Sequence, residues 1–475
     1  MTTPDLIIIG GGPAGYTAAL EAAKQGAQVR LYEKNKLGGT CLNYGCIPTK
    51  TLLESTALYQ KIKKASYFGI TVKDPEINFA RIMQRKNIVV SKLAKGLEKE
   101  LKGSTTTPPQ ILRSAAQNDV TVGNAHESSL STNDLKTYRL NDLKTNKPTT
   151  NHQPLTTTTH GNIEIIYEEI TLKEAITQAS KVIIATGTSP KVLDGTISTD
   201  DLLDIKEIPE KLHIIGAGAV GLEMATIFRQ LGSKVSISEM ADQILPGAAA
   251  KPIAEQLQKM LEKQGLRIEL STTDIPKADV VVSCIGRTYN TACFEDAGLK
   301  LGPQGEVIVD DNLHTNLPGV FAAGDINGKM LLAHVAYAQG KAAALNSLGG
   351  AETVDYTAVP YCVFTNPVLA SVGDTGANSP EANTKTIPFS QLGTAQAKGD
   401  TEGFLRLVLA EDSKQILGIQ ILGPGAAELI STATLLVQNK ATLNTLQDTI
   451  WTHPTLGEIF GAQETKSTLP GLSKA

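Results

Sequence analysis

The stretch Asp5-Leu-Ile-Ile-Ile-Gly10-Gly-Gly12-Pro-Ala-Gly15, near the amino terminus, decides the fold. Its run of apolar residues predicts a buried strand, and the glycines that follow predict a tight turn into a helix. An alanine-rich segment then continues to Lys24, and a second apolar segment, 28–33, ends at Glu33. The order of strand, glycine turn, helix and strand predicts a βαβ unit.

The same pattern occurs again at Leu212-His-Ile-Ile-Gly216-Ala-Gly218-Ala-Val-Gly221. A helical segment follows and stops at Gly232, and a second strand, 234–239, ends at Glu239. Glu33 follows the third glycine of its unit by 18 positions, and Glu239 follows the third glycine of its own unit by the same distance. The chain is therefore expected to contain two βαβ units of one kind.

This spacing suits a dinucleotide. The first glycine allows the tight turn, the second lets backbone N–H groups approach the pyrophosphate, and the third lets helix pack on strand. The acidic residue accepts a hydrogen bond from a ribose hydroxyl. The candidate nucleotide-binding residues are Gly10, Gly12, Gly15 and Glu33 in the first unit and Gly216, Gly218, Gly221 and Glu239 in the second. A glycine-rich turn with an incidental acid would have to occur twice with one spacing, so we predict two bound nucleotides.

Length and composition limit the class of protein. The 475 residues suggest roughly three domains of about 150 residues each, and a composition of 41% hydrophobic and 19% charged residues is that of a folded globular chain. A formal net charge of −4 gives no positive field for nucleic acid or anionic lipid. Neither a secretory signal nor a run of ~20 apolar residues is present. We expect a cytoplasmic protein with no nucleic-acid or membrane partner.

Changes in pattern along the chain predict its domains. We expect a first dinucleotide-binding domain at 1–190, a second at 191–286, a central segment at 287–350 and a carboxyl-terminal domain at 351–475. The segment 128–161, rich in Thr, Asn, Ser and Lys, predicts an inserted polar surface loop within the first domain. Alternating residues across 162–172 suggest that strands resume there.

Further apolar strands end in glycine. These strand ends are Ala185-Thr186-Gly187, the segment closing at Gly286, and Gly324-Asp325. A carboxylate such as Asp325 at the carboxyl end of a strand lies where open α/β sheets bind ligands. In the last domain, the segments 404–409 and 416–422 predict strands and the segment 426–438 predicts a helix.

The cysteines Cys41 and Cys46 form a C-x4-C pair that is followed by a helical pattern. Structural zinc needs two close pairs of ligands, and no second cysteine pair occurs, so we predict no metal site. Pro48 in an early helical turn would place Cys46 near a helix N-terminus, where the helix dipole favours the thiolate. Lys50, one turn on, would add a positive charge. A redox-active dithiol is favoured over two inert thiols, whereas Cys284, Cys293 and Cys362 are expected to be small buried side chains.

The stretch Gly38-Gly-Thr-Cys41-Leu-Asn-Tyr-Gly-Cys46-Ile-Pro-Thr-Lys50 closely resembles the active-site signature of the flavin-dependent pyridine nucleotide–disulfide oxidoreductases, and within them of the dihydrolipoamide dehydrogenases. The resemblance spans nearly the whole chain, because both glycine motifs, the strand ends above and His453-Pro-Thr-Leu-Gly-Glu458 follow in the family's order. It implies an α/β fold with two Rossmann-like domains, the first for FAD and the second for NAD, and a carboxyl-terminal α+β dimerisation domain.

The resemblance also implies roles for single residues. Cys46 resembles the flavin-proximal thiolate and Cys41 the thiol that exchanges with substrate. Lys50 resembles the lysine beside the flavin that pairs with the residue at Glu223, and Asp325 resembles the group that holds the flavin's ribityl chain. The remaining cofactor-binding candidates, at the strand ends, are Thr186, Gly187 and Gly286.

Near the carboxyl terminus, His453 resembles the family's catalytic base. Glu458 is close enough in sequence to fold back on the imidazole and fix its tautomer. Many relatives have a second histidine two positions earlier, where this chain has Trp451, which puts contacts at the rim of the site in doubt. The resemblance implies that a homodimer shares His453 across its interface.

The expected activity is therefore oxidation of protein-bound dihydrolipoamide with NAD. The expected substrate partner is a lipoyl-bearing acyltransferase or a glycine-cleavage carrier protein. A glutathione-reductase-like enzyme is disfavoured because Glu239 would repel the 2′-phosphate of NADP. A mercuric-reductase-like enzyme is disfavoured because no cysteine follows Cys362, and a non-catalytic flavoprotein subunit because the dithiol and His453 are intact.

Overall fold

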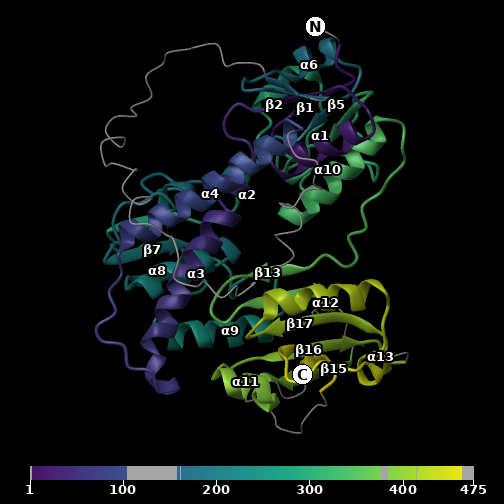
Figure 1. Cartoon of the computed structure of the whole chain (residues 1–475). Helices are drawn as coiled ribbons and strands as arrows, with labels where there is room; N and C mark the ends of the chain where they lie inside the picture. Colours follow the sequence, from purple (N-terminus) through teal and green to yellow (C-terminus); the bar gives the residue numbers. More distant parts are fainter. Residues whose placement is uncertain (1–2, 104–157, 161, 376–382, 413, 463–475) are drawn as a thin grey trace, which may run out of the picture.

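The computed structural model describes residues 3–103, 158–160, 162–375, 383–412 and 414–462 (Figure 1). Within them, two sheets that carry the glycine motifs are followed by an antiparallel sheet near the carboxyl terminus. This arrangement confirms the predicted fold class. No helix in these ranges is both long and apolar enough to cross a membrane.

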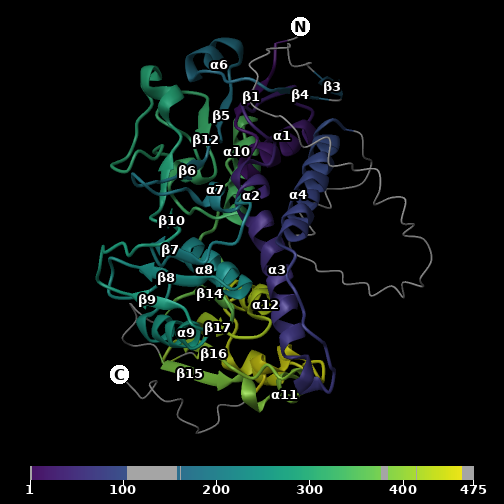
Figure 2. The same cartoon turned by 90° about the vertical axis from the view of Figure 1, so that its left-hand side faces the viewer.

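The first sheet has six strands, and β1 lies near its middle. In spatial order the strands are β12 (Val320–Ala322), β5 (Val182–Ile184), β1 (Leu6–Ile9), β2 (Val29–Tyr32), β4 (Ile163–Ile166) and β3 (Thr158–His160). All neighbours are parallel except β3, which is antiparallel to β4. The helices α1 (Pro13–Lys24) and α10 (Ala333–Ser347) lie side by side next to this sheet (Figures 1 and 2). The central segment thus returns to the first sheet and supplies its last strand.

Two sequence predictions in this region need correction. The polar insertion predicted at 128–161 lies mostly outside the described residues, but its end forms the strand β3, for which threonine is well suited. The strands expected across 162–172 extend only over β4. Leu172 instead begins the helix α6 (Leu172–Gln178), because Thr171 and Glu174 form a capping box there.

The second sheet is entirely parallel. Its strands, in spatial order, are β10 (Val280–Ser283), β7 (Lys211–Ile215), β8 (Lys234–Ser238) and β9 (Arg267–Glu269). The helices of this region are α7 (Thr199–Leu202), α8 (Ala219–Leu231) and α9 (Lys251–Lys263). The chain enters it after β6 (Thr188–Pro190) and leaves it at β11 (Arg287–Tyr289), and these two short strands pair with each other. The chain therefore passes between the first and second sheets through the paired strands β6 and β11, which are called the crossing strands below.

The helix α3 (Cys46–Lys63) connects the two regions. It starts beside α2 (Gly39–Asn43) and runs along α8, as both views show (Figures 1 and 2). Leu52 on α3 is 2% exposed and belongs to the same apolar cluster as Leu222 and Phe228 of α8. α4 (Phe79–Leu101) then packs along α3. The helix that begins with Cys46 is thus part of the core of the second region.

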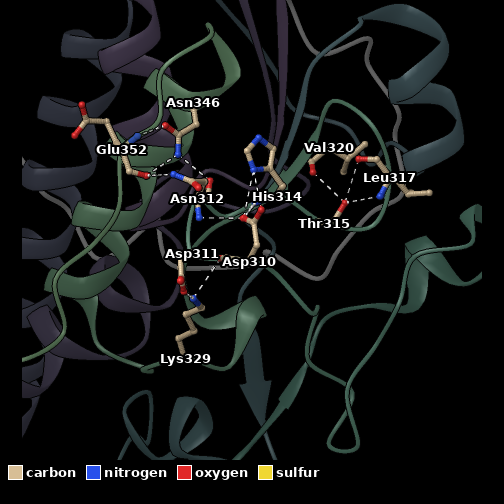
Figure 3. Close-up of polar contacts among 10 residues, drawn as sticks. All are labelled: Asp310, Asp311, Asn312, His314, Thr315, Leu317, Val320, Lys329, Asn346 and Glu352. Atoms are coloured by element: carbon tan, nitrogen blue, oxygen red, sulfur yellow. Dashed lines mark hydrogen bonds and ion pairs between the residues drawn. The ribbon is translucent and has the colours of Figure 1, made fainter.

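The central segment is held in place by polar contacts (Figure 3). The Asp310 carboxylate accepts hydrogen bonds from the backbone N–H groups of Asn312 at 3.0 Å and His314 at 2.8 Å. Asn346, near the end of α10, donates to the carbonyl oxygen of Asn312 at 2.8 Å. Because this turn leads into β12, these contacts help to fix the strand that precedes Asp325.

The carboxyl-terminal region has a five-stranded antiparallel sheet and its own apolar core. Its strands, in spatial order, are β13 (Tyr361–Val363), β14 (Leu369–Gly373), β17 (Ile416–Leu422), β16 (Phe404–Leu409) and β15 (Asn383–Pro388). The helix α12 (Ala426–Gln438) packs against β14 and β17, while α11 (Gly393–Lys398) lies at the lower left and α13 (Leu443–Asp448) at the right of this region in Figure 1. The predicted segments 404–409, 416–422 and 426–438 are confirmed as β16, β17 and α12.

Candidate active site

The turn between β1 and α1 is tight against the sheet and open at the helix N-terminus. Gly10 has a φ of +106°, and a Cβ there would lie 2.4 Å from the carbonyl oxygen of Ala185, so only glycine fits. Gly12 precedes α1, and a Cβ there would meet only Gly39, at 3.8 Å. The space in front of the helix N–H groups can therefore hold a phosphate.

The second glycine motif has the same shape. Gly216 has a φ of +101°, and a Cβ there would lie 2.5 Å from the carbonyl oxygen of Cys284. A Cβ on Gly218, just before α8, would meet no atom within 4 Å, whereas one on Gly221 would lie 2.1 Å from the Gly216 carbonyl oxygen. In the first motif, a Cβ on Gly15 would likewise meet the Gly10 carbonyl oxygen. Each motif thus has two glycines packed against backbone atoms and one that faces open space, which fits two dinucleotides.

The acidic residue of each unit also holds its glycine turn. The Glu33 carboxylate accepts hydrogen bonds from the N–H of Gly11 at 2.8 Å and from the N–H two residues after itself at 2.7 Å. The Glu239 carboxylate accepts hydrogen bonds from the N–H of Ala217 at 2.7 Å and from the N–H two residues after Glu239 itself at 2.8 Å. A carboxylate has about four acceptor positions, so each can still accept from a ribose hydroxyl. The sequence predicted a ribose hydroxyl as the partner of each acid, but it did not predict that each carboxylate also accepts hydrogen bonds from backbone N–H groups.

Asp325 lies in a polar network at the crossing strands. Its carboxylate accepts a hydrogen bond from the Thr188 hydroxyl at 3.2 Å. Arg287 donates to that hydroxyl at 2.6 Å, to the Thr188 carbonyl oxygen at 2.7 Å and to the hydroxyl of Thr40 at 3.3 Å. Burial raises the pKa of Asp325, while Arg287 and Thr188 act in the opposite direction. Sequence reasoning missed Arg287; the available signal was a charged residue directly after Gly286.

The end of β5 is joined to the segment after β11. The Thr186 hydroxyl donates to the carbonyl oxygen of Asn290 at 2.9 Å, and the Asn290 side-chain amide donates back to the carbonyl oxygen of Thr186 at 2.9 Å. Gly187 follows with a φ of +64°. Thr186 and Gly187 therefore lie beside the crossing strands, as does Gly286, which precedes β11.

The cysteine pair lies where α2 meets α3. Cys41 is on α2, and Cys46 is the first residue of α3. The pKa of the Cys46 thiol is lowered, first because the Cys41 thiol donates a hydrogen bond to it and then because Lys50 is positively charged, although burial opposes both. The same hydrogen bond, together with burial, raises the pKa of Cys41 well above its usual value. In the reduced pair these opposite shifts favour a thiolate on Cys46 and a protonated thiol on Cys41.

Lys50 joins α3 to the second region. Its ammonium nitrogen donates to Glu223 Oε2 at 2.8 Å and lies 3.9 Å from the centre of the Phe364 ring. Glu223 Oε1 accepts from the backbone N–H of Phe364 at 3.0 Å. The pairing of Lys50 with Glu223 was expected, whereas Phe364 gave no signal in the sequence. Three segments that are distant along the chain thus meet one turn from Cys46.

Replacing Lys50 by methionine is expected to raise the pH midpoint for alkylation of Cys46 by about 1 unit, because a positive charge near the thiolate is lost. The measurement is the pH dependence of iodoacetamide modification of the reduced protein, resolved for each cysteine by mass spectrometry. Lys61→Met, at an exposed position on the same helix, is the matched control and should leave the midpoint unchanged. An unchanged midpoint in Lys50→Met would show that Lys50 does not stabilise the thiolate.

His453 forms a pair with Glu458. His453 Nδ1 lies 2.8 Å from Glu458 Oε1, and the backbone N–H of Thr455 donates to Glu458 Oε2 at 2.8 Å. The hydrogen bond from His453 lowers the pKa of Glu458, and the one from Thr455 adds to this. An ionised Glu458 holds the proton on Nδ1, which leaves Nε2 free to accept one. The 3-10 helix Leu456–Phe460 begins directly after Thr455 and places Glu458 on its first turn.

Trp451 belongs to the core of the last region rather than to the rim of the site. Its indole N–H donates to the carbonyl oxygen of Leu446 at 2.9 Å, and its ring stacks on Phe460 with centroids 5.4 Å apart. The position where many relatives have a second histidine is therefore used for packing.

The other three cysteines are not arranged for redox chemistry. Burial raises the pKa of Cys284 and of Cys362 to about 12, and it also raises the pKa of Cys293. A buried thiol that stays protonated is inert and acts as a small apolar group. In the part of the chain that the structure describes, no three His, Cys, Asp or Glu side chains are placed to hold a metal ion.

A cysteine pair at a helix N-terminus, together with a glycine turn that can hold a dinucleotide on each of two Rossmann-like sheets, is the arrangement of a flavin-dependent disulfide oxidoreductase. Comparison with protein families agrees with this class. The chain belongs to the pyridine nucleotide-disulphide oxidoreductase family, whose profile matches residues 4–340, and the profile of that family's dimerisation domain matches residues 359–463.

Similar proteins are found over nearly the full length of the chain. It is 35% identical to a dihydrolipoyl dehydrogenase of Chlamydia trachomatis, over 96% of this chain and 95% of the relative. It is 32% identical to the mitochondrial dihydrolipoyl dehydrogenase of Pisum sativum, over 96% of this chain and 89% of the relative. Among solved structures, the Cu(II) complex of the HOCl-induced flavoprotein disulfide reductase RclA from Escherichia coli has a TM-score of 0.75 at 26% identity, covering 96% of this chain and 98% of that one.

Proposed function

We propose that this protein is a dihydrolipoyl dehydrogenase, which oxidises protein-bound dihydrolipoamide and passes a hydride to NAD. The observation that carries the proposal is the cysteine pair where α2 meets α3, in which the Cys46 thiol has a lowered pKa one helical turn from the Lys50–Glu223 ion pair. The relatives that match over nearly the whole chain have this activity as their name. The cofactors are FAD at the first glycine motif and NAD at the second.

The reaction follows from the charges on the pair. A substrate thiolate attacks the Cys41 sulfur of the disulfide, and the electron pair of the broken bond leaves on Cys46 as a thiolate. The second substrate thiol, deprotonated by His453, then displaces Cys41, which releases the oxidised lipoyl disulfide and a reduced pair. Lys50 stabilises the Cys46 thiolate by its charge. Bound FAD supplies the two-electron relay between this reduced pair and NAD.

Glu239 supports NAD as the hydride acceptor, because its carboxylate would repel the 2′-phosphate of NADP. Glu239→Gln combined with Met240→Arg is expected to move the ratio of kcat/KM for the two cofactors toward NADP by about 1–3 kcal/mol. Met240 is suited to this because it follows Glu239 and is 78% exposed. Met240→Arg alone is the control, with Glu239 still repelling the phosphate. A ratio unchanged in the double variant would count against this motif as the NAD site.

The oligomer, the substrate protein and the compartment belong to the same proposal. The dimerisation domain at residues 359–463 supports a homodimer. The substrate protein is a lipoyl-bearing acyltransferase or a glycine-cleavage carrier protein, since both present a lipoyl group. A cytoplasmic location is supported by relatives from bacteria such as Chlamydia and Geobacillus and by a dithiol that must cycle between two redox states.

The test is a comparison of substrates with the purified FAD-loaded protein. Turnover of dihydrolipoamide with NAD should exceed turnover with NADP, and both should exceed turnover of glutathione disulfide with NADH or NADPH. Preferential reduction of glutathione disulfide with NADPH would replace the proposal by a glutathione-reductase-like function. A protein that binds FAD but turns over none of these substrates would have to be a non-catalytic subunit.

A further inference from the structure

Helix α3, which begins with Cys46, makes polar contacts with α8 at two separate places. The first is the ion pair between Lys50 and Glu223 described above. The second is Gln230, which is 9% exposed. The Thr56 hydroxyl donates to Gln230 Oε1 at 2.6 Å, and the Gln60 side-chain amide donates to the carbonyl oxygen of Gln230 at 2.9 Å.

The two points are spaced almost equally along both helices. At a rise of about 1.5 Å per residue, Thr56 lies about 9 Å beyond Lys50 on α3, and Gln230 lies about 10 Å beyond Glu223 on α8. Because both pairs occur in the same order, the helices run in the same direction. Their N-termini, one with Cys46 and the other at the second glycine motif, are therefore at the same end.

Apolar packing and a single ion pair still allow α3 small rotations against α8, whereas a second directional contact restricts them. We propose that Gln230 is a positioning residue, which fixes α3 at a second point and so holds Cys46 and Lys50 in place at its N-terminus. The inference rests on the proposed function, since it concerns the same dithiol. It adds a residue that lies about two turns from the ion pair and outside both glycine motifs.

The chemistry of the contact supports positioning over simple packing. Elsewhere the interface of α3 and α8 is largely apolar, since Leu52 of α3 and Leu222 and Phe228 of α8 belong to one buried cluster. An apolar side chain of similar length would fill this space without the desolvation of an amide. A buried hydrogen bond is directional, so it selects one relative position of the two helices where apolar contact alone would allow several.

The test uses Gln230→Met in the FAD-loaded full-length protein. The variant keeps the length of the side chain and loses the Oε1 acceptor of the Thr56 hydroxyl, while the backbone carbonyl oxygen still accepts from Gln60. We expect kcat for dihydrolipoamide to fall about 3–10-fold with KM changed less than about 2-fold, as for the loss of an interaction that acts in the transition state. Two further readouts do not depend on turnover: a weaker long-wavelength absorbance after two-electron reduction, and a higher pH midpoint for alkylation of Cys46.

Matched variants separate positioning from stability. Thr56→Val removes the donor to Gln230 and should reproduce both changes, whereas Thr56→Ser keeps a hydroxyl and should restore the absorbance and the midpoint. Thr226→Val removes a buried hydroxyl on α8 that bonds only within its own helix, to the carbonyl oxygen of Leu222 at 2.8 Å. It should lower Tm and leave the absorbance and the midpoint unchanged.

Several results would overturn the inference. One is that Gln230→Met and Thr226→Val both lower Tm and leave the absorbance and the midpoint as in the parent. If Gln230→Met does not fold, the Thr56 variants decide. The inference is then overturned if Thr56→Val and Thr56→Ser have the same long-wavelength absorbance and the same pH midpoint for alkylation of Cys46. A parent protein that does not oxidise dihydrolipoamide would contradict the proposed function instead, and the alkylation midpoints would still decide whether Gln230 positions Cys46.

Discussion

Cys46→Ser is expected to lower kcat for dihydrolipoamide by roughly 10³–10⁶-fold, the range in which removal of a catalytic nucleophile falls. A serine hydroxyl stays protonated, so the variant has no group that can store the electron pair of the cleaved disulfide. The variant should also lack the long-wavelength absorbance expected of the FAD-loaded parent after two-electron reduction, because that band would need a thiolate at position 46. Steady-state kinetics and absorbance spectra of the FAD-loaded protein measure both effects.

Two other variants make this test specific. Cys41→Ser should lose turnover but keep the absorbance, because it leaves Cys46, the proposed thiolate, in place. Cys293→Ser should change neither, since burial raises the pKa of that thiol and keeps it protonated. If the absorbance persists in Cys46→Ser, the sulfur next to the flavin has been assigned to the wrong cysteine.

The local parts of the fold could be predicted from the sequence. The first βαβ unit, with β1 at Leu6–Ile9 and α1 ending at Lys24, follows from an apolar run, a glycine turn and an alanine-rich helix. The helix over Ala426–Gln438 follows from its apolar pattern alone. Such signals depend on neighbouring residues, so a single sequence contains them. The strand β3 was missed because threonine-rich segments suit both loops and edge strands.

The residues of the site could be predicted less completely. The dithiol, the glycines and the acids lie in short motifs, and the structure brings Lys50 and Glu223 together as the resemblance implied. Arg287 and Phe364 were missed because their partners are more than 90 residues away along the chain. A tertiary hydrogen bond leaves no pattern near either residue. For the same reason, no sequence signal showed that α3 packs in the core of the second region.

The position of His453 supports the proposal that the site is shared between two chains. Its side chain is 76% exposed, and its Nδ1 is held by Glu458, so Nε2 is available to a group outside its own region. Among the hydrogen bonds of the described residues, none joins His453 to Cys41 or Cys46. α2, with Cys41, lies in the upper half of Figure 1, and α13, which precedes His453, lies in the lower half. A base must come within about 2.6–3.2 Å of the thiol that it deprotonates.

A mixed dimer is therefore expected to recover activity that neither parent variant has. Differently tagged Cys41→Ser and His453→Ala chains are produced together, and the dimer that carries both tags is isolated by two affinity steps. If the site is shared across a two-fold interface, one of its two sites has both cysteines from the His453→Ala chain and the histidine from the Cys41→Ser chain. About half of the wild-type turnover should then return, because one of two equivalent sites is intact.

The controls are the two parent homodimers, which should both be nearly inactive, and a mixed dimer of two differently tagged wild-type chains, which should be fully active. A mixed dimer of Cys41→Ser and Cys46→Ser chains is a further control, because every site in it lacks one cysteine. It should be inactive whichever chain supplies the histidine. If each subunit uses its own His453, both sites of the first mixed dimer are broken and no activity returns. That result would contradict the shared site and would require His453 to reach the dithiol of its own chain by a change of structure.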